Sequence, residues 1–120
     1  MKKNSKEYLN FIQECNSQIS NYPLDLKWKK LSDEWLNKAF AQRYVYNFES
    51  LERPVIQTPN DMIAMQEIIW EIKPDLIIET GSAHGGSAIM SASMLAMLDI
   101  CEAIDNDQNL NPKVSNRKVL

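Results

Sequence analysis

The residues best suited to bind a ligand lie in one short stretch, from Glu79 to Ser87. The stretch begins with an acid, contains all three glycines of the chain, and ends in a serine that opens an apolar segment long enough for a helix. Glycine adopts positive φ angles and lets a ligand approach the main chain closely. The first N–H groups of a helix have no partners inside it and point back toward the turn. The pattern therefore predicts a ligand site made by a turn and a helix N-terminus.

The residues before this stretch predict the strand that positions it. Leu76, Ile77 and Ile78 form a short apolar run after Pro74, and we expect a strand from Leu76 to Thr80 that is buried on both faces, as in a parallel sheet. In α/β proteins, a strand that ends in a glycine turn and leads into a helix holds a cofactor beyond its carboxyl end. The sequence thus indicates the α/β class.

Three familiar glycine motifs do not match the turn. Gly81 and Gly86 have the spacing of a phosphate-binding loop, but Ser87 stands where that loop has its lysine. Ala83 breaks both the dinucleotide fingerprint and the nucleophile elbow. What remains is Glu79 at a strand end followed by spaced glycines, with no cation aimed at phosphates. An acidic rim suits a ligand with positive charge, such as S-adenosylmethionine, which carries an ammonium and a sulfonium.

Each residue of the turn also has a purely structural interpretation. Glu79 could simply cap the exposed strand end, but an acid beside glycines at a strand's carboxyl edge favours a ligand role. Gly81 and Gly85 can form the turn and admit a ligand at once. His84, the single histidine, is as consistent with a bystander as with a residue that lines the pocket. The hydroxyl of Ser87 is interpreted first as a helix-start group and second as a ligand contact.

The string from Glu79 to Ser87, with Ile89–Leu98 after it and Arg53–Met62 before it, resembles the cephalosporin hydroxylase / rhamnosyl O-methyltransferase family. These proteins are class I S-adenosylmethionine-dependent methyltransferases. The resemblance covers Tyr44 to Leu120 well and the N-terminal third loosely; the family has a glycine where Glu52 stands. It implies S-adenosylmethionine as cofactor. The cofactor-binding residues that it implies are Glu79, Thr80, Gly81, Ser82, His84, Gly85, Gly86 and Ser87.

The resemblance also implies a reaction, the methylation of a hydroxyl group on a sugar, glycolipid or small natural product. Most of the catalysis would come from alignment of the sulfonium methyl group with the acceptor oxygen. A divalent metal such as magnesium, held by acids downstream in the family, would help to deprotonate that oxygen. Those acids are not in this chain, so we expect no metal site here, and the catalytic residues stay unknown.

The expected fold is a Rossmann-like class I methyltransferase fold, truncated after the first β-α unit and preceded by a helical extension. We divide the chain into an N-terminal helical extension, 1–50, and the first part of an S-adenosylmethionine-binding domain, 51–120. The acid expected to hold the cofactor ribose would follow Leu120. We therefore expect an N-terminal portion of the enzyme that is inactive alone.

Two other functions compete with the methyltransferase hypothesis. A hydroxylase, as the family name suggests, would need two histidines and a carboxylate on iron, and this chain has His84 alone. An inactive fragment could act through a helical association surface, which would make the protein a homo-oligomer. The presence of coding sequence after Leu120 would distinguish the methyltransferase hypothesis from the inactive fragment.

The extension is predicted to contain two helices, Lys6–Ser20 and Asp33–Arg43, the second capped by Ser32. Their apolar stripes favour a packing layer or a self-association surface over a substrate lid. The alternating aromatic residues of Tyr44–Phe48 predict an extended segment.

The remaining elements are predicted from the spacing of apolar residues and from the residues that begin or end helices. A helix capped by Asn60 or Asp61 runs to Ile72, with a buried face marked by methionines and isoleucines, Met62, Met65, Ile69 and Ile72. A helix from Gly86 to Ala103 is apolar nearly all round and is expected to be buried, with Glu102 facing solvent. A second strand begins at Arg117.

Composition excludes several classes of protein. The chain has 120 residues and a formal net charge of −3, so it forms one domain at most, and it has no basic stripe for nucleic acid. Two cysteines are too few for a disulfide framework, and the reducing cytoplasm is the expected location. Polar residues interrupt any signal-like core near the N-terminus, and no apolar run reaches about 18 residues, so we expect neither a secretion signal nor a transmembrane segment.

Overall fold

A computed structural model of the chain describes residues 5–120. Contacts divide the chain into two compact units, Met1–Gln42 and Arg43–Leu120, and each is described here by itself. The elements of the first unit are α1 (Lys6–Asn21), the 3₁₀ turn η1 (Tyr22–Leu24) and α2 (Leu26–Ala41). Ser5 caps α1 by accepting a hydrogen bond of 3.2 Å from the main-chain N–H of Tyr8. The rings of Tyr22 and Trp28 stack across the turn, with centroids 5.7 Å apart.

The predicted start of the second helix, Asp33 with Ser32 as its cap, is wrong. The cap is Asp25, whose carboxylate accepts a hydrogen bond of 2.9 Å from the main-chain N–H of Trp28. Aspartate is as good an N-cap as serine, so the helix begins at the earlier of the two. Ser32 lies inside α2, where its hydroxyl donates to the carbonyl of Trp28 at 2.9 Å.

Neither helix of the first unit contains a buried residue. Large apolar side chains on both helices, among them Phe11, Trp28 and Phe40, are more than half exposed. The packing or association surface assigned to these helices therefore stays a prediction.

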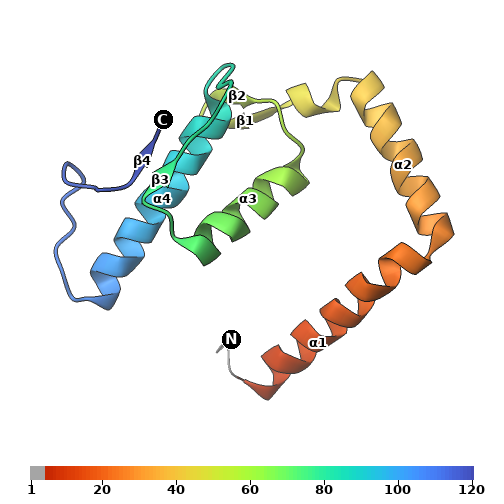
Figure 1. The fold of residues 1–120 in the computed structure, drawn as a ribbon, viewed down its shortest axis with the longest axis horizontal. Coiled ribbons are helices and arrows are strands. Elements are labelled where there is room, and N and C mark those ends of the chain that lie inside the picture. Colours follow the sequence, from red (N-terminus) through yellow and green to blue (C-terminus); the bar gives the residue numbers. More distant parts are fainter. Residues whose placement is uncertain (1–4) are drawn as a thin grey trace. The chain divides into compact units, whose positions relative to one another are not determined.

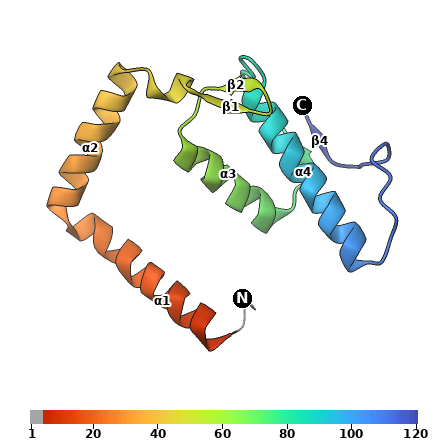
Figure 2. The same ribbon diagram turned by 180° about the vertical axis from the view of Figure 1, so that it is seen from behind.

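The second unit combines two long helices with two small sheets. Its elements are η2 (Tyr44–Tyr46), β1 (Phe48–Ser50), β2 (Arg53–Val55), α3 (Pro59–Ile72), β3 (Leu76–Ile77), α4 (Gly86–Asp105) and β4 (Lys118–Val119). Strands β1 and β2 form an antiparallel hairpin, whereas β3 and β4 pair in parallel. In both views the hairpin lies at the N-terminal end of α4, and α3 lies beside α4 (Figure 1, Figure 2). This mixture of helices and small sheets agrees with the predicted α/β class.

The extended segment predicted for Tyr44–Phe48 is wrong in its first part. Residues Tyr44–Tyr46 form a 3₁₀ turn, and the strand begins only at Phe48. The compact turn lets the ring of Tyr44 meet the ring of Phe48 edge-on, with centroids 5.0 Å apart and an interplanar angle of 79°. Such an aromatic pair is worth about 0.5–1.5 kcal/mol beyond the area it buries. This contact favours the 3₁₀ turn over an extended strand.

Two residues in left-handed conformation join β1 to β2. Ser50 pairs with Arg53, and the loop residues Leu51 and Glu52 have φ angles of 48° and 65°. Positive φ at both central residues is what a type I′ hairpin turn requires, and Asn-Gly is its preferred sequence. Glycine at the position of Glu52 would therefore fit the backbone better than glutamate does.

The core of the second unit lies between α3, α4 and the parallel pair. Ile69 from α3 meets Leu95 and Leu98 from α4, and these residues are 2%, 3% and 1% exposed. Ile77 of β3 and Val119 of β4 pack against the cluster. The small parallel sheet is therefore held against α4 by apolar contacts on one face.

The burial predicted for the strand is wrong. Strand β3 ends at Ile77, before the predicted end at Thr80, and Leu76 and Ile78 are 47% and 70% exposed. Within residues 5–120, β3 pairs only with β4, so its other edge has no strand neighbour. A parallel strand is buried on both faces only when other elements cover both faces.

The helices also bury less than their sequences predict. In α3 only Ile69 is buried, whereas Met65 and Ile72 are exposed, and the cap is Thr58 rather than Asn60 or Asp61. In α4 one face is buried, formed by Gly86, Met90, Ser91, Leu95 and Leu98. By length and composition alone, α4 could cross a membrane, but the core helices of soluble proteins can be equally long and apolar. Here α4 packs against α3, β1, β2 and β4.

The N-terminus of α4 rests directly on the main chain of β2. A Cβ atom built on Gly86 would lie 2.8 Å from the carbonyl oxygen of Arg53 and 2.6 Å from the carbonyl carbon of Pro54. The carbonyl oxygen of Pro54 would be nearer still. Real Cβ atoms essentially never come within 3.0 Å of such atoms. Glycine at this position therefore sets how closely the helix approaches the hairpin.

We expect Gly86→Ala to lower the free energy of unfolding by about 1–3 kcal/mol, the usual cost of overpacking. Helix propensity alone would favour alanine by up to about 1 kcal/mol, so the sign of the change decides between the two effects. Urea unfolding followed by far-UV circular dichroism measures it.

Gly85→Ala is the reference for a Cβ atom added without a steric clash: nothing lies within 4 Å, so its loss, about 1–2 kcal/mol, comes from the φ of +82° alone. A Gly86→Ala variant as stable as the parent would show that the close approach does not constrain the fold.

Candidate functional site

The parallel pairing of β3 and β4 continues beyond the two strands and ends at Glu79. The main-chain N–H of Leu120 donates to the carbonyl of Ile77 at 2.9 Å, and the N–H of Glu79 donates to the carbonyl of Leu120 at 2.8 Å. Glu79 therefore lies just past the carboxyl end of β3, where its side chain is half-buried. This is the place, beyond the carboxyl end of a parallel strand, where α/β proteins bind ligands.

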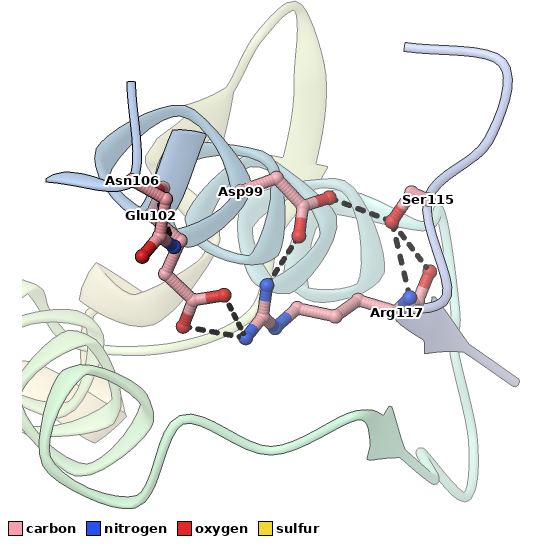
Figure 3. Close-up of polar contacts among 5 residues, drawn as sticks. All are labelled: Asp99, Glu102, Asn106, Ser115 and Arg117. Carbon is pink, nitrogen blue, oxygen red and sulfur yellow. Dashed lines mark hydrogen bonds and ion pairs between the residues drawn. The ribbon is translucent and has the colours of Figure 1, made fainter. Parts of the chain in front are cut away.

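A cluster of charged side chains ties the segment that leads into β4 to helix α4. The guanidinium of Arg117 contacts Asp99 through Nη1 and both carboxylate oxygens of Glu102 through Nη2, at 2.8 and 2.9 Å (Figure 3). Ser115 completes the cluster by donating from Oγ to Asp99 at 2.6 Å. The side chain of Arg117 is 11% exposed. Glu102 was predicted to face solvent, and its side chain is 39% exposed, but both of its carboxylate oxygens also pair with Arg117.

The cluster shifts the protonation of its members. The hydrogen bond from Ser115 lowers the pKa of Asp99 below its ordinary value of 3.8; burial opposes this effect and Arg117 adds to it. Burial disfavours the charge on Arg117, but the hydrogen bonds and charges of Glu102 and Asp99 prevail and raise the pKa of the guanidinium. Both shifts favour the charged forms, so the ion pairs persist at neutral pH.

The turn after β3 depends on left-handed backbone conformations. Gly81 and Gly85 have φ angles of 83° and 82°, as expected for glycines that form a turn, and Ala83 between them has φ 44°. The N–H of Gly85 donates to the carbonyl of Ser82 at 2.6 Å and closes the turn. A Cβ atom at Gly81 would meet nothing within 4 Å, so the space beside this residue is open.

One side-chain hydrogen bond connects the two ends of the turn. The hydroxyl of Ser87, in the first turn of α4, donates to Oε1 of Glu79 at 2.5 Å. Both side chains are half-buried. The bond links the end of the strand to the start of the helix, eight residues later in the chain.

A pocket of about 380 Å³ opens beside the turn. It lies within the usual range of small-molecule pockets, about 300–1,000 Å³. Predicted site residues that line it are Glu79, Thr80, Gly81, Ser82 and Ser87. The other lining residues are mostly apolar and come from β2 and the segment after it, α3, β3 and α4; they include Pro54, Ile56, Gln57, Met65, Ile78 and Met90.

The remaining predicted residues lie elsewhere around the turn. His84 and Gly85 line a second pocket of about 440 Å³, to which Glu79, Ser82 and Arg53 also contribute. Gly86 is buried against the main chain of β2.

The part of the pocket that the glycine pattern did not reveal is the wall formed by Pro54, Ile56 and Gln57. The signal for it was the stretch from Arg53 to Met62, which forms part of the family resemblance but contains no residue that suggests chemistry.

Comparison with known proteins identifies the family. A family model described as Rhamnosyl O-methyltransferase/CmcI matches residues 42–120, which include the hairpin, the glycine turn and both long helices of the second unit. The chain therefore belongs to this family, as its sequence predicts, and the family is one of methyltransferases. No curated protein and no solved structure matches the chain.

We expect Arg117→Met to destabilise the protein at pH 7 by about 1–3 kcal/mol. Removing one partner of a fully buried ion pair lowers the free energy of unfolding by more than this. The expected loss is smaller here because Glu102 is 39% exposed, so water screens part of its charge. The loss should shrink on acidification. Because the folded state lowers the pKa of Asp99, the stabilisation that its ionised form contributes is present above pH 3.8 and lost as pH falls through the lowered value.

Urea unfolding at pH 7 and at several values below pH 4 measures both effects. Lys113→Met is the matched control, because it removes an exposed positive charge from the loop between α4 and β4, and we expect a change within about 0.5 kcal/mol. Equal effects of the two substitutions at pH 7 would show that the cluster does not hold the loop.

Proposed function

We propose that the pocket at the end of β3 binds S-adenosylmethionine and that the protein acts as an O-methyltransferase on a hydroxyl of a sugar, glycolipid or small natural product. The observation that carries this proposal is the half-buried carboxylate of Glu79, at the carboxyl end of a parallel strand and beside a pocket of suitable size. Membership of a methyltransferase family supports it. In this proposal β3 and α4 are the first β-α unit of a Rossmann-like fold.

The charge of the pocket suits a cationic ligand. None of the residues that line it is lysine or arginine, and Glu79 is its single carboxylate. The phosphates of a nucleotide cofactor would have no side-chain cation here, whereas the ammonium of S-adenosylmethionine would have a partner. The open space beside Gly81 adds room for a ligand next to the main chain.

When bound, S-adenosylmethionine supplies an electrophilic methyl group. The residues of this chain would bind and orient it: Glu79 by its charge, and Gly81 by exposing the main chain. Met65, Ile78 and Met90 line the pocket with apolar surface that displaces water. Such alignment is a large part of the catalysis of a two-substrate transfer.

The magnesium suggested by the family resemblance finds no support in this chain. Across residues 5–120, no three histidine, cysteine, aspartate or glutamate side chains gather as a metal site would need. No step of the proposed mechanism is therefore assigned to a metal here.

The proposal predicts that S-adenosylhomocysteine, the demethylated form of the cofactor, binds the ¹⁵N-labelled chain and shifts amide resonances of residues 79–87. We expect weak binding, with a dissociation constant of about 0.1–1 mM. The reason is that Thr80, Gly81 and Ser82 are exposed, so a bound ligand would stay partly in contact with solvent. The measurement is a series of two-dimensional NMR spectra at rising ligand concentration. Absence of shifts at millimolar ligand, or shifts confined to α1 and α2, would contradict the proposal.

Two substitutions test the site itself. Gly81→Val should abolish the shifts, because a branched side chain fills the open space and is strained at φ +83°. Glu79→Gln should weaken binding by roughly ten- to hundredfold, which corresponds to the loss of a charge-assisted hydrogen bond of about 1.5–3 kcal/mol. Glu67→Gln, on an exposed position of α3, is the control for the charge change.

Circular dichroism must accompany these titrations, since loss of the fold would imitate loss of the site. If both variants fold and bind like the parent, the turn is only a structural connection.

A further inference from the structure

We infer that Ser87 is a positioning residue, which acts on the cofactor through Glu79 by fixing the orientation of its carboxylate before the ligand arrives. The inference rests on the proposed function, since it assigns Ser87 a role in binding the cationic group of S-adenosylmethionine. It differs from the interpretation of Ser87 as a helix-start hydroxyl or as a direct ligand contact.

The geometry of the bond supports this role. The Oγ–Oε1 distance of 2.5 Å lies at the short end of the range for a hydroxyl that donates to a carboxylate, about 2.5–2.7 Å. The bond occupies Oε1, and among the described residues no other hydrogen bond to the side chain of Glu79 is present. Oε2 therefore keeps both of its lone pairs for a ligand. Both residues line the same pocket.

The arrangement is not the usual capping role of a serine near a helix start. A capping hydroxyl accepts a hydrogen bond from a main-chain N–H, whereas Ser87 donates to a side chain. The N-cap residue of α4 is Gly85, which has no side chain to serve as a cap. The hydroxyl is thus directed at the carboxylate rather than at its own helix.

Orientation matters because a glutamate side chain has several rotatable bonds. A carboxylate that must be ordered when the ligand binds lowers the affinity, whereas one already held loses little freedom. Main-chain pairing fixes Glu79 at one end through Leu120, and Ser87 fixes its carboxylate at the other. Removal of the hydroxyl should therefore weaken binding of ligands that carry the ammonium, and of those alone.

The test compares a ligand that carries the ammonium with one that lacks the amino acid tail bearing it. S-adenosylhomocysteine carries an amino acid tail with the ammonium and a carboxylate, and 5′-methylthioadenosine lacks this tail. By NMR titration of the 120-residue chain, Ser87→Ala should weaken binding of the first by about three- to tenfold and of the second by less than about twofold. Ser87→Thr, which keeps the hydroxyl, should restore the affinity to within about twofold of the parent.

The double variant shows whether Ser87 acts through Glu79. In a Glu79→Gln background the carboxylate is gone, so Ser87→Ala should change the initial slope of the S-adenosylhomocysteine titration, which is proportional to the affinity, by less than about twofold. Ser93→Ala is the matched control: the hydroxyl of Ser93 is on the same helix, half-buried, and donates to the carbonyl of Met90 at 2.7 Å. It should leave both affinities unchanged.

The outcomes separate this inference from the proposed function. If the parent chain does not bind S-adenosylhomocysteine, the proposed function is wrong and the inference falls with it. If the parent binds but Ser87→Ala matches Ser93→Ala, weakens both ligands equally, or acts independently of Glu79→Gln, the inference alone is overturned. A selective loss for S-adenosylhomocysteine, rescued by threonine and absent without Glu79, supports it.

Discussion

The close approach of Gly86 to the main chain of β2 is the constraint on which the second unit depends. Because no Cβ intervenes, the N-terminus of α4 rests on the carbonyl groups of Arg53 and Pro54. The helix placed in this way is the element that contacts α3, both hairpin strands and β4. The contact also brings Pro54 and Ile56 to the pocket that Glu79 and Ser87 line from the turn. A single glycine therefore serves both the packing and the shape of the site.

The second constraint concerns the register of β4. The strands pair Leu76 with Lys118 and Ile77 with Val119, and a few flanking main-chain hydrogen bonds extend the pairing, so hydrogen bonds alone define the register weakly. Arg117 directly precedes β4 and is held by two acids of α4. An ion pair of this kind adds little net stability compared with apolar packing, but a slipped register would leave its charges without partners. The cluster thus helps to place Leu120 where its carbonyl accepts the N–H of Glu79.

Local sequence predicted the local structure of the site well. The order of strand, glycine turn and helix, and positive φ at Gly81 and Gly85, follow from residue types that allow few alternatives. Burial was predicted less well, since it depends on elements distant in sequence. Ile78 looks like a core residue but is 70% exposed, because the neighbours of a strand cannot be deduced from its own residues. The role of Glu102 was missed for the same reason: its partner Arg117 lies fifteen residues away, across a loop.

Ala83 shows that the turn holds its shape at some energetic cost. A side chain in the left-handed region is less stable by roughly 1–2 kcal/mol than in the usual conformation, and Ala83 lies there, with φ 44°. The surrounding bonds offset this cost: the N–H of Gly85 closes the turn on Ser82, and Ser87 joins the start of the helix to Glu79. A turn closed by its own bonds has little freedom left to lose when a ligand binds. The selectivity of the proposed site would then depend on the charge and orientation of Glu79 more than on folding of the turn around the ligand.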